Sequence, residues 1–328
     1  MRIVFAGSGS FGLPSLEALV AGGQEVPLIL TQPDRPSGRG RHVRMGPVKR
    51  FARERDIPVL QSENINTASA VRRVRSVQPD LLLVVAFGQK IGPKLIEMPT
   101  YGAVNLHGSL LPKYRGPAPV NWAIINGETE TGLTVIAMTS QIDAGDSLGQ
   151  RATAIDPNET AGQLHDRLAE LGARLVTEMV REIPLDEVER RRQDENRATP
   201  APRLKKADGR INWNRPARDV HNHIRGMTPW PGAFAQLTLG DKKKTRLRLG
   251  IDRAVISPVV ASGAAPGTIV DAAAQGIDVA VARGAVRILE VTPAGKRTMT
   301  AADFLNGHAV EPGLRFAAVQ ERASARRR

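Results

Sequence analysis

Three polar side chains near the middle of the chain have types and a spacing that suit catalysis. Asn105 and His107 are separated by one residue, so on a β-strand both side chains point to the same face. An amide donor and an imidazole, a common proton carrier, would then project together. Asp143 follows a second apolar run, Thr134 to Met138, in a loop that could bring a carboxylate back beside the histidine.

Each of these residues also has an ordinary structural interpretation. Asn105 could cap a turn, His107 could be a hydrogen-bonded histidine at a sheet edge, and Asp143 could be a loop acid. Taken singly, each residue fits the structural interpretation better than the catalytic one. The catalytic hypothesis therefore depends on the three side chains lying together.

The first half of the chain supplies the elements that would position them. Short, continuously apolar runs alternate with helix-like stretches, which is typical of a parallel sheet covered by helices on both faces. The sequence therefore predicts a doubly wound, mostly parallel α/β domain of Rossmann-like type. Gly108 ends one strand at the carboxyl edge, where ligands of such folds bind. The expected strands are Arg2 to Ala6, Val26 to Thr31, Pro58 to Gln61, Asp80 to Gly88 and Gly102 to His107.

The second half of the chain has a different pattern. A long amphipathic helix that begins after Thr160 is predicted to close the first domain, residues 1–183. Residues 184–207 are dense in charge and proline and are predicted to form an exposed linker. Short strand-like runs with frequent turn signals predict a smaller β-barrel domain over residues 208–316. Residues 317–328 are expected to form a basic tail.

Composition restricts the class of protein and of partner. The 328 residues are 41% hydrophobic, enough for one or two cores, and the absence of cysteine favours a reducing cytoplasm. We expect no signal peptide and no membrane span, because the apolar runs are too short. A formal net charge of +13 favours nucleic acid as a partner, unless it only reflects an arginine-rich lineage.

The N-terminal turn offers a competing hypothesis. Gly7, Gly9 and Gly12 form a G-x-G-x-x-G pattern after the first strand, and Asp34 stands roughly where a ribose-binding acid would. A nicotinamide dehydrogenase would use these groups. However, glycine is common at any strand-to-helix turn, Pro14 suits the first turn of a helix, and Asp34 lies between two prolines. The sequence therefore favours a protein that does not use NAD as a cofactor.

The block from Gly102 to Asp146 resembles a known family. Asn-x-His is followed by Ser-Leu-Leu-Pro-x-Tyr-Arg-Gly and, after a strand, by Asp-x-Gly-Asp. This succession resembles the active site of the folate-dependent formyltransferases. Two positions depart from the family pattern: Gln141 stands where glycine is usual and could alter the Asp143 loop, and Phe87 stands where tyrosine is frequent.

The resemblance implies a reaction in which an amine attacks the formyl carbon of 10-formyltetrahydrofolate, the cosubstrate. By resemblance, Asn105 donates to the oxyanion, His107 holds the oxyanion or moves a proton, and Asp143 orients the imidazole. No metal and no covalent enzyme intermediate is needed. The resemblance also places the folate beside two loops, whose residues are Phe87, Gly88, Gln89, Ser109, Leu110, Leu111 and Pro112.

Basic segments indicate the acceptor. The segment from Arg35 to Arg50, both ends included, has six Lys or Arg residues and no Asp or Glu, a composition that suits phosphate contacts. This segment resembles a loop of the family members that formylate the methionine carried on initiator tRNA, and residues 208–316 resemble their basic barrel of the oligonucleotide-binding (OB) type. The expected tRNA contacts are Arg35, Arg39, Arg41, Lys242, Lys243 and Lys244. Arg35 is expected mainly to brace the loop.

Three alternatives stay open. A formyltransferase acting on a small amine, such as an amino sugar nucleotide, would respond neither to salt nor to tRNA. A dehydrogenase would bind NAD and no folate. A catalytically silent RNA-binding protein would keep its function without His107. Nothing in the sequence demands more than a monomer.

Overall fold

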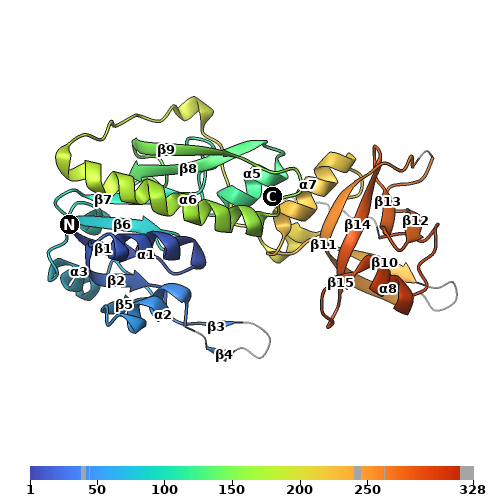
Figure 1. Ribbon diagram of the computed structural model, residues 1–328, viewed down its shortest axis with the longest axis horizontal. Helices are drawn as coiled ribbons and strands as arrows, with labels where there is room; N and C mark the ends of the chain where they lie inside the picture. The colour runs from blue at the N-terminus through green and yellow to red at the C-terminus, as the bar shows by residue number, and fades with distance from the viewer. Residues whose placement is uncertain (38–41, 44, 240–244, 262, 318–328) are drawn as a thin grey trace, which may run out of the picture. The chain divides into compact units, whose positions relative to one another are not determined.

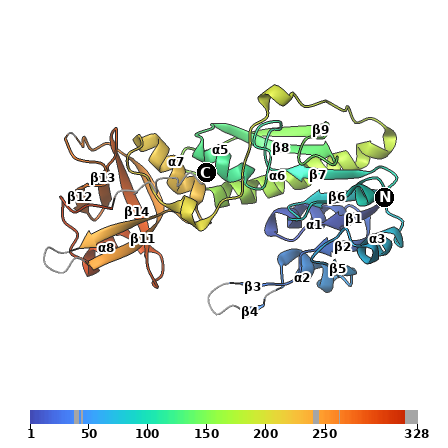
Figure 2. The same ribbon diagram turned by 180° about the vertical axis from the view of Figure 1, so that it is seen from behind.

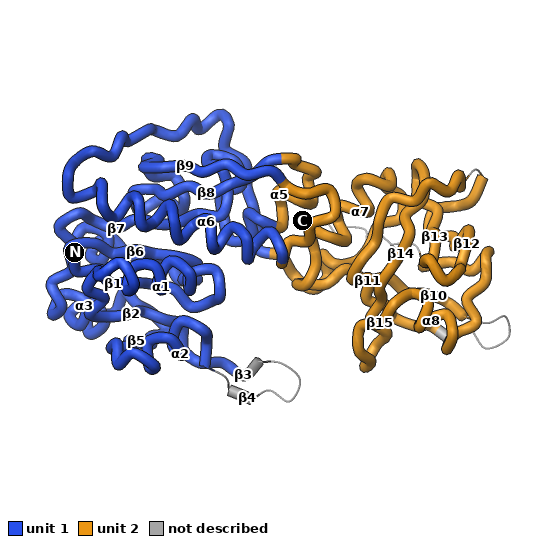
Figure 3. The backbone as a smooth tube through the Cα atoms, viewed as in Figure 1, with its two compact units in different colours: residues 1–120, 130–154, 163–203 blue, residues 121–129, 155–162, 204–328 orange. Residues whose placement is uncertain are grey.

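The computed structural model describes residues 1–37, 42–43, 45–239, 245–261 and 263–317. Figure 3 shows its two compact units. Unit 1 contains Met1–Val120, Glu130–Ala154 and Gln163–Arg203, and unit 2 contains Asn121–Thr129, Ile155–Gly162 and the chain from Leu204 onward. The chain therefore enters unit 2 twice, in short excursions, before it continues there.

Unit 1 is built on a seven-stranded sheet with the strand order β5-β2-β1-β6-β7-β8-β9 (Figure 1, and from behind in Figure 2). The first five strands in this order are parallel, and β8 and β9 are antiparallel to their neighbours. This arrangement confirms the predicted mostly parallel α/β sheet. The strands are β1 (Arg2–Ala6), β2 (Glu25–Thr31), β5 (Val59–Gln61), β6 (Leu81–Val85), β7 (Ala103–His107), β8 (Glu130–Ala137) and β9 (Ser147–Ala154).

Helices cover both faces of this sheet. On one face, α3 and α4 pack through Val74 and Leu95 against alternate strand residues such as Val4. On the other face, α6 packs closely enough that a Cβ at Gly172 would lie 2.7 Å from Leu106 of β7. The helices are α1 (Leu13–Ala21), α2 (Pro47–Glu54), α3 (Ala68–Arg75), α4 (Pro93–Ile96), α5 (Pro119–Ile125) and α6 (Ala161–Glu182), with the turn η1 (Ser10–Gly12) and the hairpin β3 (Pro36–Ser37) and β4 (His42–Val43). None of the helices among the described residues has the length and apolarity to cross a membrane.

Unit 2 is built on a six-stranded antiparallel sheet of order β10-β11-β14-β13-β12, with β15 paired to β14. Residues 315 and 316 link the two edges of the sheet, because Phe316 bridges to Leu237 of β10 and Arg315 bridges to Thr268, which directly precedes β12. The sheet therefore curls, as a barrel requires. Its elements are α7 (Ala217–Met227), β10 (Phe234–Leu239), β11 (Thr245–Ser257), β12 (Ile269–Ala273), β13 (Gly276–Ala280), β14 (Ala285–Pro293), β15 (Met299–Thr300) and α8 (Ala301–Gly307).

The expected linker, residues 184–207, contains buried positions. Its first 20 residues belong to unit 1, where Arg191 bridges to Ser147 and Pro200 bridges to Arg115. Gln193 is only 7% exposed. Most residues of this stretch are exposed, but these contacts hold part of it against distant loops of unit 1. Composition does not reveal such hydrogen-bond partners. It includes the short turns η2 (Ile183–Leu185), η3 (Glu195–Arg197) and η4 (Lys206–Gly209).

Candidate active site

Strand β7 places Asn105 and His107 on one face at its carboxyl end, next to β6 and β8. Asn105 pairs with Val84 of β6 and with Ile136 of β8, so the strand is fixed on both sides. His107 is only 6% exposed. The expected geometry follows from the two-residue period of a strand.

Asp143 lies beside both side chains. Its Oδ1 is 3.4 Å from the Asn105 amide nitrogen, which donates to it, and 3.7 Å from Nδ1 of His107. Its Oδ2 accepts a hydrogen bond of 2.9 Å from the backbone nitrogen of Gly116. The structure thus brings the three expected side chains together, with long distances between Asp143 and the two groups on β7.

The second ring nitrogen of His107 also faces an oxygen. Nε2 lies 2.9 Å from the backbone carbonyl of Tyr114. A carbonyl can only accept a hydrogen bond, so Nε2 is the donor in this contact, and Nδ1 faces the Asp143 carboxylate at 3.7 Å. An amide nitrogen carries two hydrogens, so Asn105 can donate to Asp143 and to a second oxygen at once. This group can therefore donate to an anionic oxygen and hold a proton near it.

The loop that carries Asp143 has little freedom. Asp143 has a left-handed backbone (φ 54°), and a Cβ at Gly145 would lie 1.7 Å from the carbonyl oxygen of Ala137. The side chain of Gln141 is exposed, and its backbone nitrogen donates to Oγ1 of Thr139 at 3.2 Å. The departure from the family pattern at Gln141 is therefore accommodated at the surface of the loop.

Thr134 and Gln150 hold the loop after β7 by hydrogen bonds, and neither residue was expected from the sequence. Oγ1 of Thr134 donates to the Ser109 carbonyl at 2.7 Å and accepts from the Leu111 nitrogen at 3.0 Å, and Gln150 donates to the Leu111 carbonyl at 2.7 Å. The buried Ser109 hydroxyl donates to the carbonyl of Lys113 at 2.6 Å. Leu110 and Pro112 are half-buried. A polar residue within a strand does not by itself indicate that it supports a loop, so the sequence did not reveal the role of Thr134 and Gln150.

The segment after β6 presents mainly backbone. Phe87 is buried in the core, and its carbonyl accepts from the Gln32 amide at 3.1 Å. The Gln89 side chain accepts from the Ile65 nitrogen at 2.8 Å and donates to the Ser62 carbonyl at 2.6 Å. Gly88 is exposed and has a φ of +82°, a conformation that favours glycine. A ligand beside this segment would therefore meet backbone groups rather than the Phe87 or Gln89 side chains.

The expected tRNA contacts are only partly described. Arg35 is exposed and pairs with Glu63 at 2.8 Å. The residues Arg39, Arg41, Lys242, Lys243 and Lys244 lie outside the described part of the chain.

The groups of the dinucleotide hypothesis are used internally. A Cβ at Gly7 would lie 2.8 Å from the carbonyl of Val85, so this glycine allows β1 to end against β6. Asp34 pairs with Lys49, and the hydrogen bond from Lys49 lowers the pKa of this carboxyl. Gln61 also donates to Asp34, at 3.2 Å. Packing therefore accounts for Gly7 and an ion pair for Asp34, two of the features that suggested NAD.

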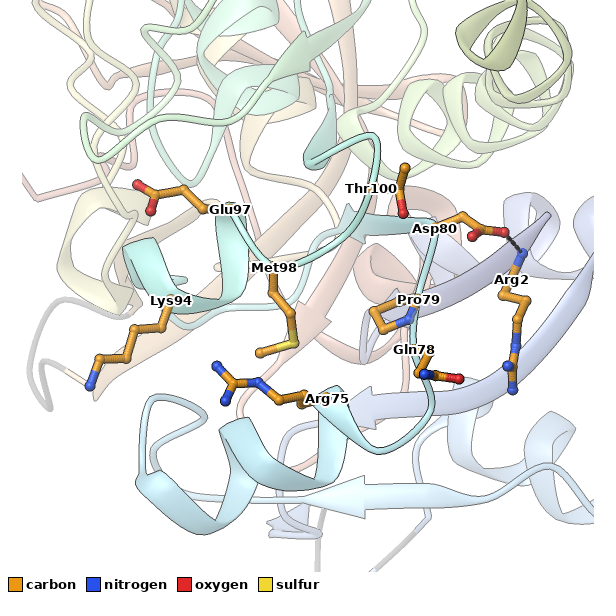
Figure 4. Close-up of a pocket in the computed structure, with 9 residues that line it drawn as sticks. All are labelled: Arg2, Arg75, Gln78, Pro79, Asp80, Lys94, Glu97, Met98 and Thr100. Atoms are coloured by element: carbon orange, nitrogen blue, oxygen red, sulfur yellow. Dashed lines mark hydrogen bonds between the residues drawn. The ribbon is translucent and has the colours of Figure 1, made fainter.

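A cavity of about 750 Å³ lies at the opposite edge of the same sheet (Figure 4). Arg2 at the start of β1 and Asp80 just before β6 line it, and the Arg2 backbone donates to the Asp80 carboxylate at 2.7 Å. These are the amino ends of parallel strands, whereas Asn105 and His107 lie at a carboxyl end. Ligands of open α/β sheets bind at the carboxyl ends, so this cavity is separate from the candidate active site.

Comparison with known proteins gives a consistent result. Residues 1–180 match the family model described as formyl transferase, and residues 203–309 match the model described as formyl transferase, C-terminal domain. The chain is 42% identical over 316 residues to a methionyl-tRNA formyltransferase of Geobacter sulfurreducens, covering 96% of each protein. It is 44% identical over 313 residues to that of Acetivibrio thermocellus, covering 95% of this chain and 98% of the relative.

Solved structures share the fold at low sequence identity. The sugar 3N-formyl transferase WlaRD, solved in the presence of dTDP and 5-N-formyl-THF, is 17% identical with a TM-score of 0.64. The alignment covers 90% of this chain and 99% of WlaRD. HypX of Aquifex aeolicus, in complex with tetrahydrofolic acid, also has a TM-score of 0.64 at 17% identity, over 93% of this chain and 47% of HypX.

Proposed function

This chain belongs to the formyl transferase family, and we propose that it transfers the formyl group of 10-formyltetrahydrofolate to the amino group of methionine on initiator tRNA. The product is N-formylmethionyl-tRNA for translation initiation. The observation that carries the chemistry is the meeting of Asn105, His107 and Asp143 at one strand end. The acceptor is supported by the full-length relationship to methionyl-tRNA formyltransferases at about 42% identity.

The reaction exchanges one nitrogen for another at the formyl carbon. The amine forms a bond to that carbon, the bond to folate N10 breaks, and one proton moves from the amine to N10. Asn105 donates to the negative oxygen of the tetrahedral intermediate, and such a donor is typically worth about 3 kcal/mol. Its contact with Asp143 fixes the amide orientation so that the free hydrogen points toward the reacting oxygen.

His107 moves the proton in this proposal. Its ring lies between the Tyr114 carbonyl and the Asp143 carboxylate, which together fix the plane of the imidazole. Asp143 orients the ring and balances its positive charge, as a carboxylate does in other acyl-transfer sites. The 3.7 Å separation would shorten on substrate binding, because catalytic hydrogen bonds are often long before the substrate is present.

The folate lies, in this proposal, between the loop after β6 and the loop after β7. The exposed backbone at Gly88 and the half-buried residues Leu110 and Pro112 border that space at the carboxyl ends of their strands. Oxygen and nitrogen atoms of the backbone can recognise the pterin edge by paired hydrogen bonds. The folate supplies an activated formyl group, and the protein supplies its position.

The tRNA is bound through basic segments in this proposal. Arg39 and Arg41 contact the acceptor stem, Arg35 braces their loop through Glu63, and Lys242, Lys243 and Lys244 contact phosphates from a unit 2 barrel of the OB type. A net charge of +13 supports this partner. We place the enzyme in the cytoplasm as a monomer.

The test is transfer of labelled formyl from 10-formyltetrahydrofolate to methionyl initiator tRNA, with the native protein, His107→Ala and Arg41→Ala at two salt concentrations. His107→Ala should lower kcat by about 10²- to 10⁴-fold. Arg41→Ala should raise KM for the tRNA and reduce the slope of binding against salt by about one.

Other outcomes would redirect the assignment. If the native protein binds folate but does not formylate tRNA, the acceptor is a small amine and the basic loop is a solvated surface. If it binds NAD and no folate, the dehydrogenase hypothesis replaces this one. If His107→Ala leaves every measured function intact, the residue is structural.

A further inference from the structure

Gln193 is buried beside the Asp143 loop although it lies in a stretch dense in charge. Its side-chain nitrogen donates to the carbonyl of Asp143 at 2.9 Å and to the carbonyl of Gly145 at 2.7 Å. Its side-chain oxygen accepts two hydrogen bonds from the guanidinium of Arg115, at 3.1 and 2.8 Å. The Gln193 amide therefore donates two hydrogen bonds through its nitrogen and accepts two through its oxygen.

Arg115 connects this amide to the other side of the site. Its backbone neighbours touch the candidate catalytic groups, because the Tyr114 carbonyl faces His107 and the Gly116 nitrogen donates to Asp143. The Arg115 backbone pairs with the chain on both sides of Pro200, donating to Thr199 at 2.8 Å and accepting from Ala201 at 2.6 Å. The turn 114–116 is therefore clamped to the same segment that carries Gln193.

Glu195 is an exposed residue that also pairs with Arg115. Both of its carboxylate oxygens lie 2.8 Å from the Arg115 guanidinium, and this hydrogen bond raises the pKa of Arg115. Arg115 thus donates to the Gln193 oxygen from Nε and Nη2, and to the Glu195 carboxylate from Nη1 and Nη2. A planar fork of donors suits two acceptors held at fixed positions.

We propose that Gln193 is a positioning residue, which ties the Asp143 loop to the turn 114–116 and so holds the Asp143 carboxylate beside His107. The inference rests on the proposed function, because it assumes that Asp143 acts on His107. The position needs a group with two donor hydrogens on one side and an acceptor on the other, which a carboxylate or an apolar side chain does not provide. The side chain must also be long enough to reach two carbonyls of one loop.

The experiment compares Gln193→Met, Gln193→Glu and the control Glu195→Gln in the full-length protein, measuring kcat, KM for the tRNA, the pH profile and Tm. Gln193→Met keeps the length and loses every hydrogen bond, so kcat should fall about 10- to 100-fold, the range expected for a misplacement of about 1 Å. KM for the tRNA should change less than threefold. Glu195→Gln keeps an acceptor for Arg115 and should stay within about twofold of the native kcat.

Gln193→Glu separates positioning from a merely structural role. An ionised carboxylate would face the carbonyls of Asp143 and Gly145 without a hydrogen to donate. At lower pH it becomes protonated and can donate one hydrogen bond, so the kcat ratio of Gln193→Glu to Gln193→Met should rise as the pH falls. A ratio that stays constant with pH, with losses of kcat that follow Tm, would overturn the proposal.

A second readout does not depend on the reaction. The Gly116 amide donates to the Asp143 carboxylate, so its hydrogen exchange should accelerate in Gln193→Met and not in Glu195→Gln. Unchanged exchange would contradict the inference even if the native protein proved inactive toward tRNA. A native protein without tRNA formylation would contradict the proposed function alone.

Discussion

Each unit contains a largely buried charged side chain that contacts groups from distant parts of the chain: Asp143 in unit 1 and Arg225 in unit 2. The two side chains differ in the lengths of their hydrogen bonds. In unit 1, Asp143 meets Asn105 and His107 at 3.4 and 3.7 Å. In unit 2, Arg225 is 7% exposed and donates to Oδ1 of Asn222 at 2.9 and 3.0 Å and to the Glu159 carbonyl at 3.1 Å.

The difference is in how completely the charged group is satisfied. Arg225 makes two hydrogen bonds of 2.9 and 3.0 Å to the Asn222 side chain and two more, of 3.3 and 3.1 Å, to the backbone carbonyls of Asp156 and Glu159, and burial lowers its pKa. Asp143 has one short contact, from Gly116, and long ones to the groups on β7. A charge that only supports the fold can be saturated, whereas a charge that takes part in a reaction must keep neighbours that can move or gain a partner. The comparison predicts activity effects in unit 1 and stability effects in unit 2.

The largest expected effect is on catalysis. Asn105→Ala should lower kcat by about 10²- to 10³-fold, because the proposed donor to the oxyanion is lost, while Tm changes by only a few degrees. Single-turnover transfer of labelled formyl measures the first quantity and thermal unfolding the second. Asn222→Ala is the matched control in unit 2, and the comparison fails if it slows transfer as much as Asn105→Ala does.

The next effect is a dependence of unit 2 stability on pH. Burial, and secondly the charge of Arg225, lower the pKa of His221 from 6.5 to about 4. Between these values the unfolded chain binds a proton that the folded chain does not, so the free energy of unfolding should fall on acidification from pH 6.5 to pH 4, by at most about 3 kcal/mol. Urea unfolding at a series of pH values should show a flatter profile for His221→Phe. An equal slope in both proteins would show that other groups cause the dependence.

Removing the Arg225 side chain should have a somewhat smaller effect. Arg225→Met removes the donor to the buried Asn222 oxygen, and one unsatisfied buried acceptor costs about 1–3 kcal/mol. Denaturant unfolding should report this loss, while kcat measured at saturating tRNA stays close to native. A large loss of kcat in the folded variant would contradict a purely structural role for this charge.

The smallest effect is expected at the surface of unit 1. Arg35→Ala breaks an exposed pair with Glu63, and such pairs contribute at most about 1 kcal/mol. The free energy of unfolding should therefore stay nearly unchanged, and Glu63→Ala should behave in the same way. If Arg35 braces the basic loop, both variants should raise KM for the tRNA slightly and equally. If only Arg35→Ala raises KM, the guanidinium contacts the tRNA itself.

Local patterns in the sequence determined the frame of unit 1 and part of its site. Continuous apolar runs such as Leu81–Val85 predict buried parallel strands, and leucines at helical spacing predict α6. The spacing of Asn105 and His107 fixes their common face, because the period of a strand is two residues. These features depend on neighbours in the sequence, so they can be read without a structure.

Only the tertiary structure decided what holds the site together. Gln193 meets Asp143 across 50 residues of chain, and Gln150 meets Leu111 across 39. The excursions of Asn121–Thr129 and Ile155–Gly162 into unit 2 likewise have no compositional signal. A polar side chain has the same sequence signature whether it is exposed or buried, because burial depends on hydrogen-bond partners that the fold brings from elsewhere. The residues proposed to carry the chemistry could therefore be predicted from the sequence, but the residues that hold them in place, such as Gln193 and Gln150, could not.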